Sequence, residues 1–361
     1  FTSDKLCMRT DGKASKYYDD FHSPPVFSPN SKSVAYIASQ DGKQFVVVDG
    51  DRKETYDGIG GNSIHFSPDG ERLAYVALDN NKYIAVVDGK REKPYQGIGK
   101  FAFSYDNENY AYIAGVDGKQ CVVVNGEEQK KYDAIKSSPL FAPQGSRLAY
   151  IAEEDNRQFA VVNGEEGKQY EEIFGKWLMF SNDGKHIAYP AKKGRKWCVV
   201  VDGKESKTYS NIGKPVFSPD SKKLAYVTVE NGNYVVIMNG EKSRAYDRIA
   251  NGSLVFSPNS ERLAYVARKG EKEFVVVNDK EQDSYGKIES VPIFSPNSRR
   301  MAYVVSDNEK QFVIVDGAEQ KRYDAIAKGS VSFSPDSKKL VYAAKKEGRW
   351  MVVINGSEGE A

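Results

Sequence analysis

One phrase of about eleven residues returns along the whole chain, and this repetition limits the possible folds more than any other feature. Phe217–Val227 has the sequence FSPDSKKLAYV, and close copies occur at Phe66–Val76, Phe256–Val266 and Phe333–Ala343. Repeats at a fixed period are typical of solenoids, arrays and propellers, which build one small unit many times. The opening Phe recurs nine times at spacings of 37 to 39 residues, at Phe27, Phe66, Phe103, Phe141, Phe180, Phe217, Phe256, Phe294 and Phe333.

Each copy contains four short apolar runs. The first ends at the Phe, the second resembles Leu224–Val227, the third is a Val-rich run such as Phe45–Val48, and the fourth has the form Tyr-x-x-Ile, as at Tyr56–Ile59. Tyr and Val favour strands. Four strands in about 38 residues leave no room for a helix, and no stretch shows a sustained 3.6-residue period. The repeat unit is therefore predicted to be a four-stranded antiparallel meander.

The spacers between the runs carry turn residues. Ser67–Gly70 has Pro to fix φ, Asp to bond nearby backbone and Gly to accept positive φ. Asn-Gly or Asp-Gly follows the third run in eight copies, for instance at Asp49-Gly50, and only Asn278-Asp279 departs from it. This dipeptide is a strong hairpin signal because both central residues must accept positive φ.

The predicted fold is all-β: a single nine-bladed β-propeller of four-stranded antiparallel blades. One such sheet cannot bury both faces alone, so neighbouring sheets must stack. The last copy lacks a Tyr-x-x-Ile run, and Lys16–Phe21 is predicted to supply its outer strand and so close the ring. One domain is expected over 1–361, with a partly repeat-like segment at 1–15, nine blades over 16–355 and a tail at 356–361. Closure would remove an exposed sheet edge.

The Phe-Ser-Pro-Asp-Gly…Leu-Ala-Tyr unit resembles the WD40-like repeats of TolB-type β-propellers, which also occur in the propellers of prolyl oligopeptidase-like enzymes. The resemblance covers about Lys16 to Asn355, in an unusual nine-repeat member. It implies a binding or interaction platform, and it implies a bacterial protein of the periplasm or the extracellular space, with a cytoplasmic location as the alternative. Fold resemblance alone does not give function.

Composition excludes several partners. Formal net charge is +2, so no strong field favours nucleic acid, and no run of about 18 apolar residues predicts a membrane span. Three cysteines are too few for a disulfide framework. The chain begins at Phe1, which is compatible with an upstream segment that has been removed. We expect a monomer.

No catalytic motif is present. The chain has no Gly-x-Ser-x-Gly elbow, His-Glu-x-x-His, P-loop or Cys-x-x-Cys, and only three histidines. We therefore predict no enzyme activity, no catalytic residue, no cofactor and no metal. Cys7, Cys121 and Cys198 are interpreted as small buried hydrophobes, with a redox or metal role as the alternative.

Two groups of residues depart from the repeat and are candidate binding residues. Aromatic and imidazole side chains near the first strands form one group, and the charged loop between the second and third strands of the fifth copy forms the other. The alternative is filling of the channel for the aromatic residues, a structural or surface role for the histidines, and simple solvation for the loop charges. The candidates are Trp177, Phe174, Phe101, His22 and His65 in the first group and Lys192, Lys193, Arg195 and Lys196 in the second.

Three functions remain open at this point. The first is a non-catalytic scaffold that binds a protein, peptide or glycan through its variable loop face and central channel. The second is an enzyme with a site at the channel mouth, similar to propeller lactonases or lyases. The third is a propeller domain cut from a larger protein.

Overall fold

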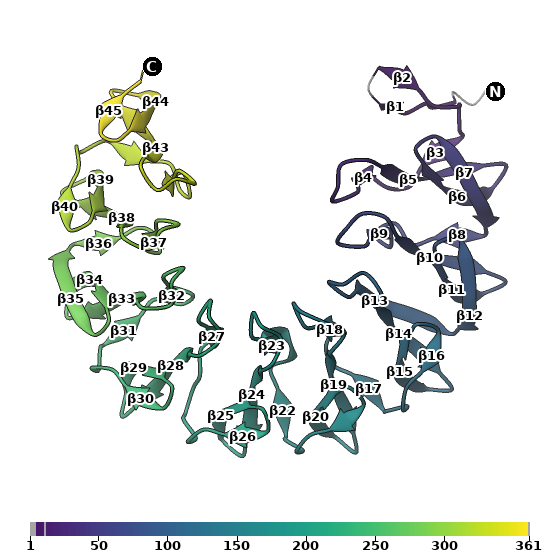
Figure 1. Ribbon diagram of the computed structural model, residues 1–361, viewed down its shortest axis with the longest axis horizontal. Helices are drawn as coiled ribbons and strands as arrows, with labels where there is room; N and C mark the ends of the chain where they lie inside the picture. Colours follow the sequence, from purple (N-terminus) through teal and green to yellow (C-terminus); the bar gives the residue numbers. More distant parts are fainter. Residues whose placement is uncertain (1–4, 11, 360–361) are drawn as a thin grey trace. The chain divides into compact units, whose positions relative to one another are not determined.

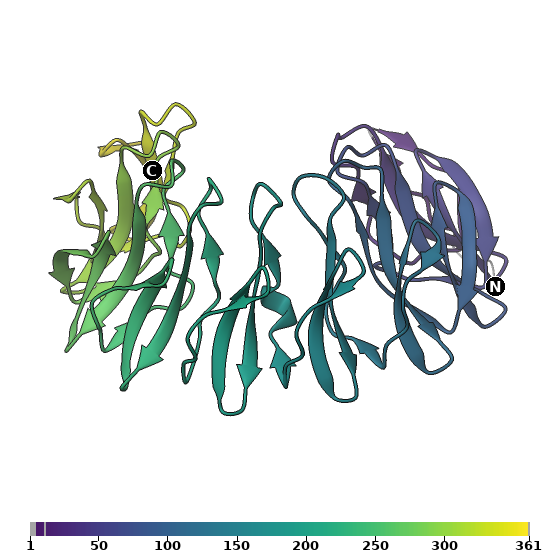
Figure 2. The ribbon, with the colours of Figure 1, turned by 60° about the horizontal axis from the view of Figure 1, so that its bottom comes forward.

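The computed structural model describes residues 5–10 and 12–359, and they form short antiparallel strands with a single turn of 3-10 helix. Nine sheets follow one another along the chain (Figure 1). Figure 2 shows the strands of each sheet running side by side. The predicted all-β class, and nine four-stranded antiparallel sheets of the blade type, are confirmed. The prediction of a single domain over 1–361 stays a prediction.

The chain divides into two compact units, one up to Phe180 and one from Ser181. The first unit holds an N-terminal hairpin and four whole sheets. Its strands are β1 (Arg9–Thr10) and β2 (Lys13–Ala14) in the hairpin; β3 (Asp20–Phe21), β4 (Val26–Phe27), β5 (Val34–Gln40), β6 (Lys43–Val48) and β7 (Asp51–Tyr56) in the first sheet; β8 (Gly58–Ile59), β9 (His65–Phe66), β10 (Leu73–Asp79), β11 (Lys82–Val87) and β12 (Lys90–Tyr95) in the second; β13 (Gly97–Phe103), β14 (Tyr110–Val116), β15 (Lys119–Val124) and β16 (Glu127–Glu128) in the third; β17 (Ala134–Ile135), β18 (Leu140–Phe141), β19 (Leu148–Glu154), β20 (Arg157–Val162) and β21 (Glu165–Glu166) in the fourth; then β22 (Glu172–Ile173), η1 (Gly175–Trp177) and β23 (Met179–Phe180).

The second unit continues the same pattern. Its strands are β24 (Ile187–Lys193), β25 (Lys196–Val201) and β26 (Lys204–Glu205) of the fifth sheet; β27 (Val216–Phe217), β28 (Leu224–Glu230), β29 (Asn233–Met238) and β30 (Glu241–Lys242) of the sixth; β31 (Arg248–Ile249), β32 (Val255–Phe256), β33 (Leu263–Lys269), β34 (Lys272–Val277) and β35 (Lys280–Tyr285) of the seventh; β36 (Lys287–Ile288), β37 (Ile293–Phe294), β38 (Met301–Asp307), β39 (Lys310–Val315) and β40 (Ala318–Glu319) of the eighth; β41 (Ala325–Ile326), β42 (Ser332–Phe333), β43 (Leu340–Lys346), β44 (Arg349–Ile354) and β45 (Ser357–Glu358) of the ninth.

The Tyr-x-x-Ile run is not one strand, because the two residues belong to successive sheets. Tyr56 ends β7 and pairs with Gln44 of the first sheet. Ile59 pairs with Ala77 of the second sheet. Together with Phe66, which pairs with Leu73, Ile59 forms a first strand that is interrupted by residues 60–64. We call the segment between the Ile and the Phe the link of its repeat, and the prediction of a continuous fourth strand through this Ile was wrong.

The prediction that Lys16–Phe21 completes the last sheet was also wrong. Tyr18 bridges Leu6 in the N-terminal segment, and Asp20 and Phe21 pair with β5 of the first sheet. The place beside β44 is taken by β45 from the end of the chain, where Val353 pairs with Glu358. Residues 356–361, predicted as a tail, therefore contain a strand, and closure into a ring stays a prediction.

The turn after the third strand is fixed by a side chain as well as by positive φ. Asp49 has a φ of 52°, and its carboxylate accepts a hydrogen bond from the first N–H of β5. Asn278 does the same for Leu263, so the copy that lacks Gly keeps the bond and places Asp279 at a φ of 60°. All nine repeats have this bond, at 2.8 to 3.0 Å. An Asn or Asp is therefore needed here for its oxygen as well as its tolerance of the left-handed backbone.

A buried serine joins the turns of successive sheets in the second unit. The hydroxyl of Ser260 accepts a hydrogen bond from the N–H of Asp220, one repeat earlier, at 2.9 Å. Ser260 is buried and has a φ of 65°. Ser221, Ser298 and Ser337 make equivalent bonds. The repeated turn therefore connects neighbouring sheets and also reverses the chain.

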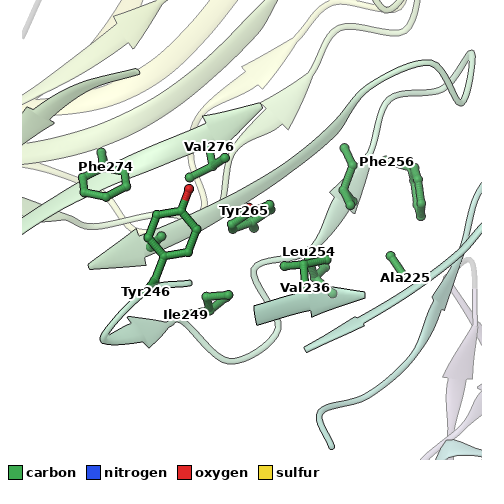
Figure 3. Packing of buried hydrophobic residues seen from close by; sticks show 11 residues of the cluster. Ala225, Val236, Tyr246, Ile249, Leu254, Phe256, Tyr265, Phe274 and Val276 are labelled. Atoms are coloured by element: carbon green, nitrogen blue, oxygen red, sulfur yellow. The ribbon is translucent and has the colours of Figure 1, made fainter. Parts of the chain in front are cut away.

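The largest buried side chains lie between sheets. Tyr56 from the end of the first sheet packs edge-to-face on Tyr75 of the second sheet, with ring centroids 6.2 Å apart. In the second unit, Tyr246 and Tyr265 pack in the same way within one cluster of the sixth and seventh sheets (Figure 3). Such pairs add to the gain from burying apolar area. Within each unit, a sheet that lies between two others is thus apolar on both faces because each face contacts a neighbour.

The third strand of the last sheet departs from this rule. Val46 in the first sheet is completely buried, whereas Val352, at the same position in β44, is 50% exposed. Trp350 and Ile354 on the same face are exposed as well.

We predict that Ser260→Ala lowers the free energy of unfolding by about 1–2 kcal/mol, because the Asp220 N–H loses its buried acceptor. Chemical denaturation measures this change. The matched control is Ser284→Ala, at an exposed position, which should stay within about 0.5 kcal/mol of the parent protein. Equal effects of the two substitutions would contradict the connecting role of Ser260.

We also predict that alkali unfolds the protein. Burial is the main cause that raises the pKa of the interface tyrosines, to about 12 for Tyr95 and Tyr150. The unfolded chain loses these protons from about pH 10, while the folded chain keeps them. Stability should therefore fall as the pH rises from about 10 toward 12. A spectrophotometric titration should show exposed residues such as Tyr105 ionising first and the buried ones only together with unfolding.

Candidate functional site

An open cleft of about 670 Å³ lies at the first strands of the second and third sheets. One wall is the link of the second sheet, from Gly60 to Ser63, together with His65. The other wall is β13, from Gly97 to Phe101, and Ile113 and Ile135 also line the cleft. The cleft therefore lies between the links of two successive sheets, within the first unit.

A pair of glycines explains why this cleft is open. Gly97 of β13 pairs with Gly115 of β14. Other first-to-second-strand pairs at this register in the described part of the chain contain at least one residue with a side chain. A Cβ at Gly97 would meet nothing within 4 Å. The equivalent residues of other repeats include Arg248 and Lys287, so this register accepts long side chains. The missing side chains leave space in the third repeat.

Two predicted site residues, His65 and Phe101, meet in the cleft. Their rings stack with centroids 5.8 Å apart and planes 12° apart. Phe101 also stacks on Tyr110 and Tyr112, at 5.7 and 5.9 Å. Phe101 is thus held between aromatic neighbours and fixes the position of His65. The irregular strand β13, which shifts register between Ile98 and Phe101, brings Phe101 to this place.

A second cleft, of about 470 Å³, adjoins the first and shares Lys100, Ile113 and Ile135 with it. It extends along the link of the fourth sheet, from Lys136 to Leu140, and reaches Gly175, Lys176 and Leu178. We call the two clefts together the first-strand groove. Four successive links of one unit therefore border it.

The charged side chains that line this groove are all basic. Lys100, Lys136 and Lys176 come from three successive links, and the lining contains no Asp or Glu. Lys136 pairs with Glu153 at 3.3 Å, whereas Lys100 and Lys176 are exposed and form no ion pair within residues 5–10 and 12–359. The whole chain has 52 basic and 50 acidic residues, so this one-sided charge is local.

The electrostatics of the groove keep His65 neutral. Burial lowers the pKa of its imidazole below the usual 6.5, and the nearby positive charge of Lys100 lowers it further. A neutral ring offers one donor and one acceptor nitrogen. His65 therefore contributes polarity, and not charge, to the wall of the groove at neutral pH.

The predicted residues Phe174 and Trp177 form a local pair at the end of the first unit. Their rings stack at 4.7 Å, and Phe174 is 39% exposed. Neither lines the groove, although Gly175 and Lys176 between them do.

The repeat register explains why Trp177 replaces a serine. In the equivalent link of the second sheet, the Ser63 hydroxyl oxygen accepts a hydrogen bond from the backbone N–H of Val76, with 3.1 Å between the nitrogen and the oxygen. In the fifth repeat the position of Val76 is occupied by Pro190, which has no N–H to satisfy. The hydroxyl is therefore dispensable in this repeat, which the sequence signals only when the two positions are read together.

The remaining predicted residues lie outside the groove. His22 is exposed, and its backbone carbonyl approaches the link of the next sheet at Gly61. In the second unit, the Nζ of Lys193 pairs with Glu205 at 2.6 Å, and the Nζ of Lys192 lies 5.7 Å from the ring centre of Trp197. Arg195 and Lys196 are exposed at the turn before and the start of β25.

The interpretation of the cysteines as buried residues is confirmed for two of them. Cys121 and Cys198 are completely buried, and Cys7 is partly buried. Burial is the main cause that raises the pKa of the Cys121 thiol to about 11. In the part of the chain that the structure describes, no three His, Cys, Asp or Glu residues gather where they could hold a metal ion. No helix in that part has the length and apolar character to cross a membrane.

No protein-family model and no curated protein matches the chain. Solved structures similar to it include a eukaryotic initiation factor, 14% identical over 90% of this chain and 97% of the other, with a TM-score of 0.47. The propeller of Dos1 is 12% identical over 80% and 90%, with a TM-score of 0.36. TolB from Acinetobacter baumannii is 17% identical over 71% and 77%, with a TM-score of 0.31. Likenesses of this size carry no argument about activity or partners, and the fold rests on the strand pairings described above.

The sequence did not single out the lysines or the glycine pair of the groove. Lys100 and Lys176 occupy links that differ in length, so their common place is not visible as a motif. Gly97 and Gly115 lie 18 residues apart and become one gap only through strand pairing.

We predict that Lys100→Gln raises the pKa of His65, because it removes the positive charge beside the ring, while burial keeps the pKa below its usual value. Proton NMR titration can follow His65 because the chain has only three histidines. Lys214→Gln is the matched control, in the link of the same length in the sixth repeat. An unchanged pKa of His65 in the Lys100→Gln variant would contradict the inference that the charge of Lys100 lowers this pKa.

Proposed function

We propose that this chain is a non-catalytic binding scaffold and that the first-strand groove is its binding site for a protein, peptide or glycan. The observation that carries the proposal is the composition of the groove. The lining combines lysine side chains, hydroxyl groups and glycine backbone with the aliphatic side chains of Ile113 and Ile135. Concave sites with an apolar lining and a few polar groups are typical ligand sites.

The rigid framework around the groove supports a non-catalytic binding role. Strand pairing, turn bonds and the stacked rings of Phe101 and His65 hold the walls in place. The links themselves vary in sequence from repeat to repeat, as binding segments on a rigid scaffold often do. Varied links on a repeated framework can thus set specificity without altering the core.

An enzyme with a site at the channel mouth is a less favoured proposal. Acid–base chemistry requires positioned groups whose pKa values lie near the working pH. Among the lining residues only His65 has an ordinary pKa near neutrality, and no carboxylate accompanies it. The groove therefore favours binding over proton transfer.

We predict that Gly97→Leu blocks ligand binding and leaves the fold intact. The new side chain would enter the cleft, and the same register holds Arg248 and Lys287 in other repeats. Peptides from a random displayed library and an array of glycans would be screened against the unmodified protein. Every binder would then be retested on Gly97→Leu, with a loss of affinity of about tenfold or more expected for groove binders.

The matched control is Ala325→Leu, at the same register in the ninth sheet and outside the groove. It should leave every affinity unchanged. Binders that are insensitive to Gly97→Leu, or a screen without binders, would contradict the proposed site, provided that thermal unfolding shows both variants to be folded.

A further inference from the structure

We propose that the first-strand groove recognises an extended acidic peptide segment in which carboxylate side chains alternate with aliphatic ones. This inference rests on the proposed function and names the class of partner for the same site. The charge of the groove carries it: three lysines from successive links line the groove, the lining contains no carboxylate, and only Lys136 is paired, with Glu153 outside the lining. A surface of one sign selects partners of the opposite sign and speeds their association.

The lysines are available to a ligand. Lys100 and Lys176 are exposed and have no ion-pair partner in the described part of the chain, so binding would not first break an existing pair. Only Lys136 is engaged, with Glu153. A lysine is a compact point charge on a flexible stem, which suits carboxylates of variable position. Two unpaired lysines on separate links, with the paired Lys136 between them in sequence, fit an extended anionic chain better than a single small anion.

The floor of the groove adds a second requirement. Val76, Ile113 and Ile135 line the first cleft, and Leu140 and Leu178 line the second. These aliphatic side chains contribute favourably to the free energy of binding when apolar groups of a ligand cover them and remove their surface from water. A purely charged polymer would leave this floor uncovered, whereas a peptide with Val, Leu or Ile between its acids would cover it.

The stacked ring of Phe101 is not offered to an acidic glycan. Tyr83 in the lining is 41% exposed, whereas Phe101 is stacked in parallel on His65, Tyr110 and Tyr112. The ring of Phe101 is therefore engaged within the protein and is not a free platform for a sugar ring. The exposed hydroxyl of Ser138 in the second cleft adds a polar group suited to a peptide backbone.

The experiment uses labelled short peptides of defined composition and the complete chain. One peptide alternates Glu or Asp with Val or Leu, a second replaces the acids by Lys, and a third replaces them by Ser. Polygalacturonate serves as the acidic glycan probe. Fluorescence anisotropy measures peptide affinity at two ionic strengths, and competition measures the glycan. The proton NMR titration of His65 reports occupancy beside Lys100.

We expect only the acidic–aliphatic peptide to bind, with an affinity that falls as salt rises. The double variant Lys100→Glu/Lys176→Glu should weaken this binding by about tenfold or more, while the matched control Lys214→Glu changes nothing. The bound carboxylates should raise the pKa of His65, because they offset the charge of Lys100. Thermal unfolding of each variant verifies that it is folded.

Other outcomes overturn the inference in separable ways. Binding of the Ser or Lys peptide that Gly97→Leu abolishes would keep the proposed site but refute its acidic selectivity. Lysine-dependent binding of polygalacturonate without binding of the peptide would assign a glycan partner instead. If none of the probes shifts His65 or responds to Gly97→Leu, both the inference and the proposed site fail.

Discussion

The structure depends on one constraint: a four-stranded sheet with two apolar faces must have both faces covered. In each unit, the pairs of tyrosines from successive sheets meet this need, as Tyr56 meets Tyr75 and Tyr246 meets Tyr265. Their burial removes large apolar area from water, and their edge-to-face packing fixes the spacing of the sheets. The repetition of Ala-Tyr along the chain follows from the repetition of this interface.

Polar side chains fix the backbone conformation of the turns, which the packing of apolar side chains alone does not determine. The Asp or Asn after the third strand accepts a hydrogen bond from the first N–H of the second strand in every repeat. In the second unit, Ser260 and its equivalents link their turns to the turn one repeat earlier. Asp57 acts similarly at the opposite ends of the strands, where it pairs with Lys43 and accepts the N–H of Asn80. A single repeat is therefore bonded to its neighbours at both ends of its strands.

The groove arises where this regular plan relaxes. The third repeat has Gly97 opposite Gly115 and an irregular first strand, and a Cβ at Gly97 would meet nothing within 4 Å. Phe101 stacks on His65 in the cleft, and lysines of successive links line the groove. Function on a repeated scaffold is thus expected where residues differ between copies and the backbone stays the same.

The sequence alone determined the all-β class, the nine units, the hairpin turns and the buried core, because these follow from local periods and turn residues that recur nine times. It placed His65 and Phe101 among the candidates, but it did not show that they touch. Tertiary structure decided the rest. Lys16–Phe21 pairs with Leu6 and with β5, and not with the last sheet, which no local pattern indicates. Tyr56 and Ile59 are three residues apart, yet Tyr56 joins the first sheet and Ile59 joins the second. The groove depends on two glycines that pair across β13 and β14 and on three lysines of successive links. Only strand pairing and the packing of successive sheets bring these residues to one lining.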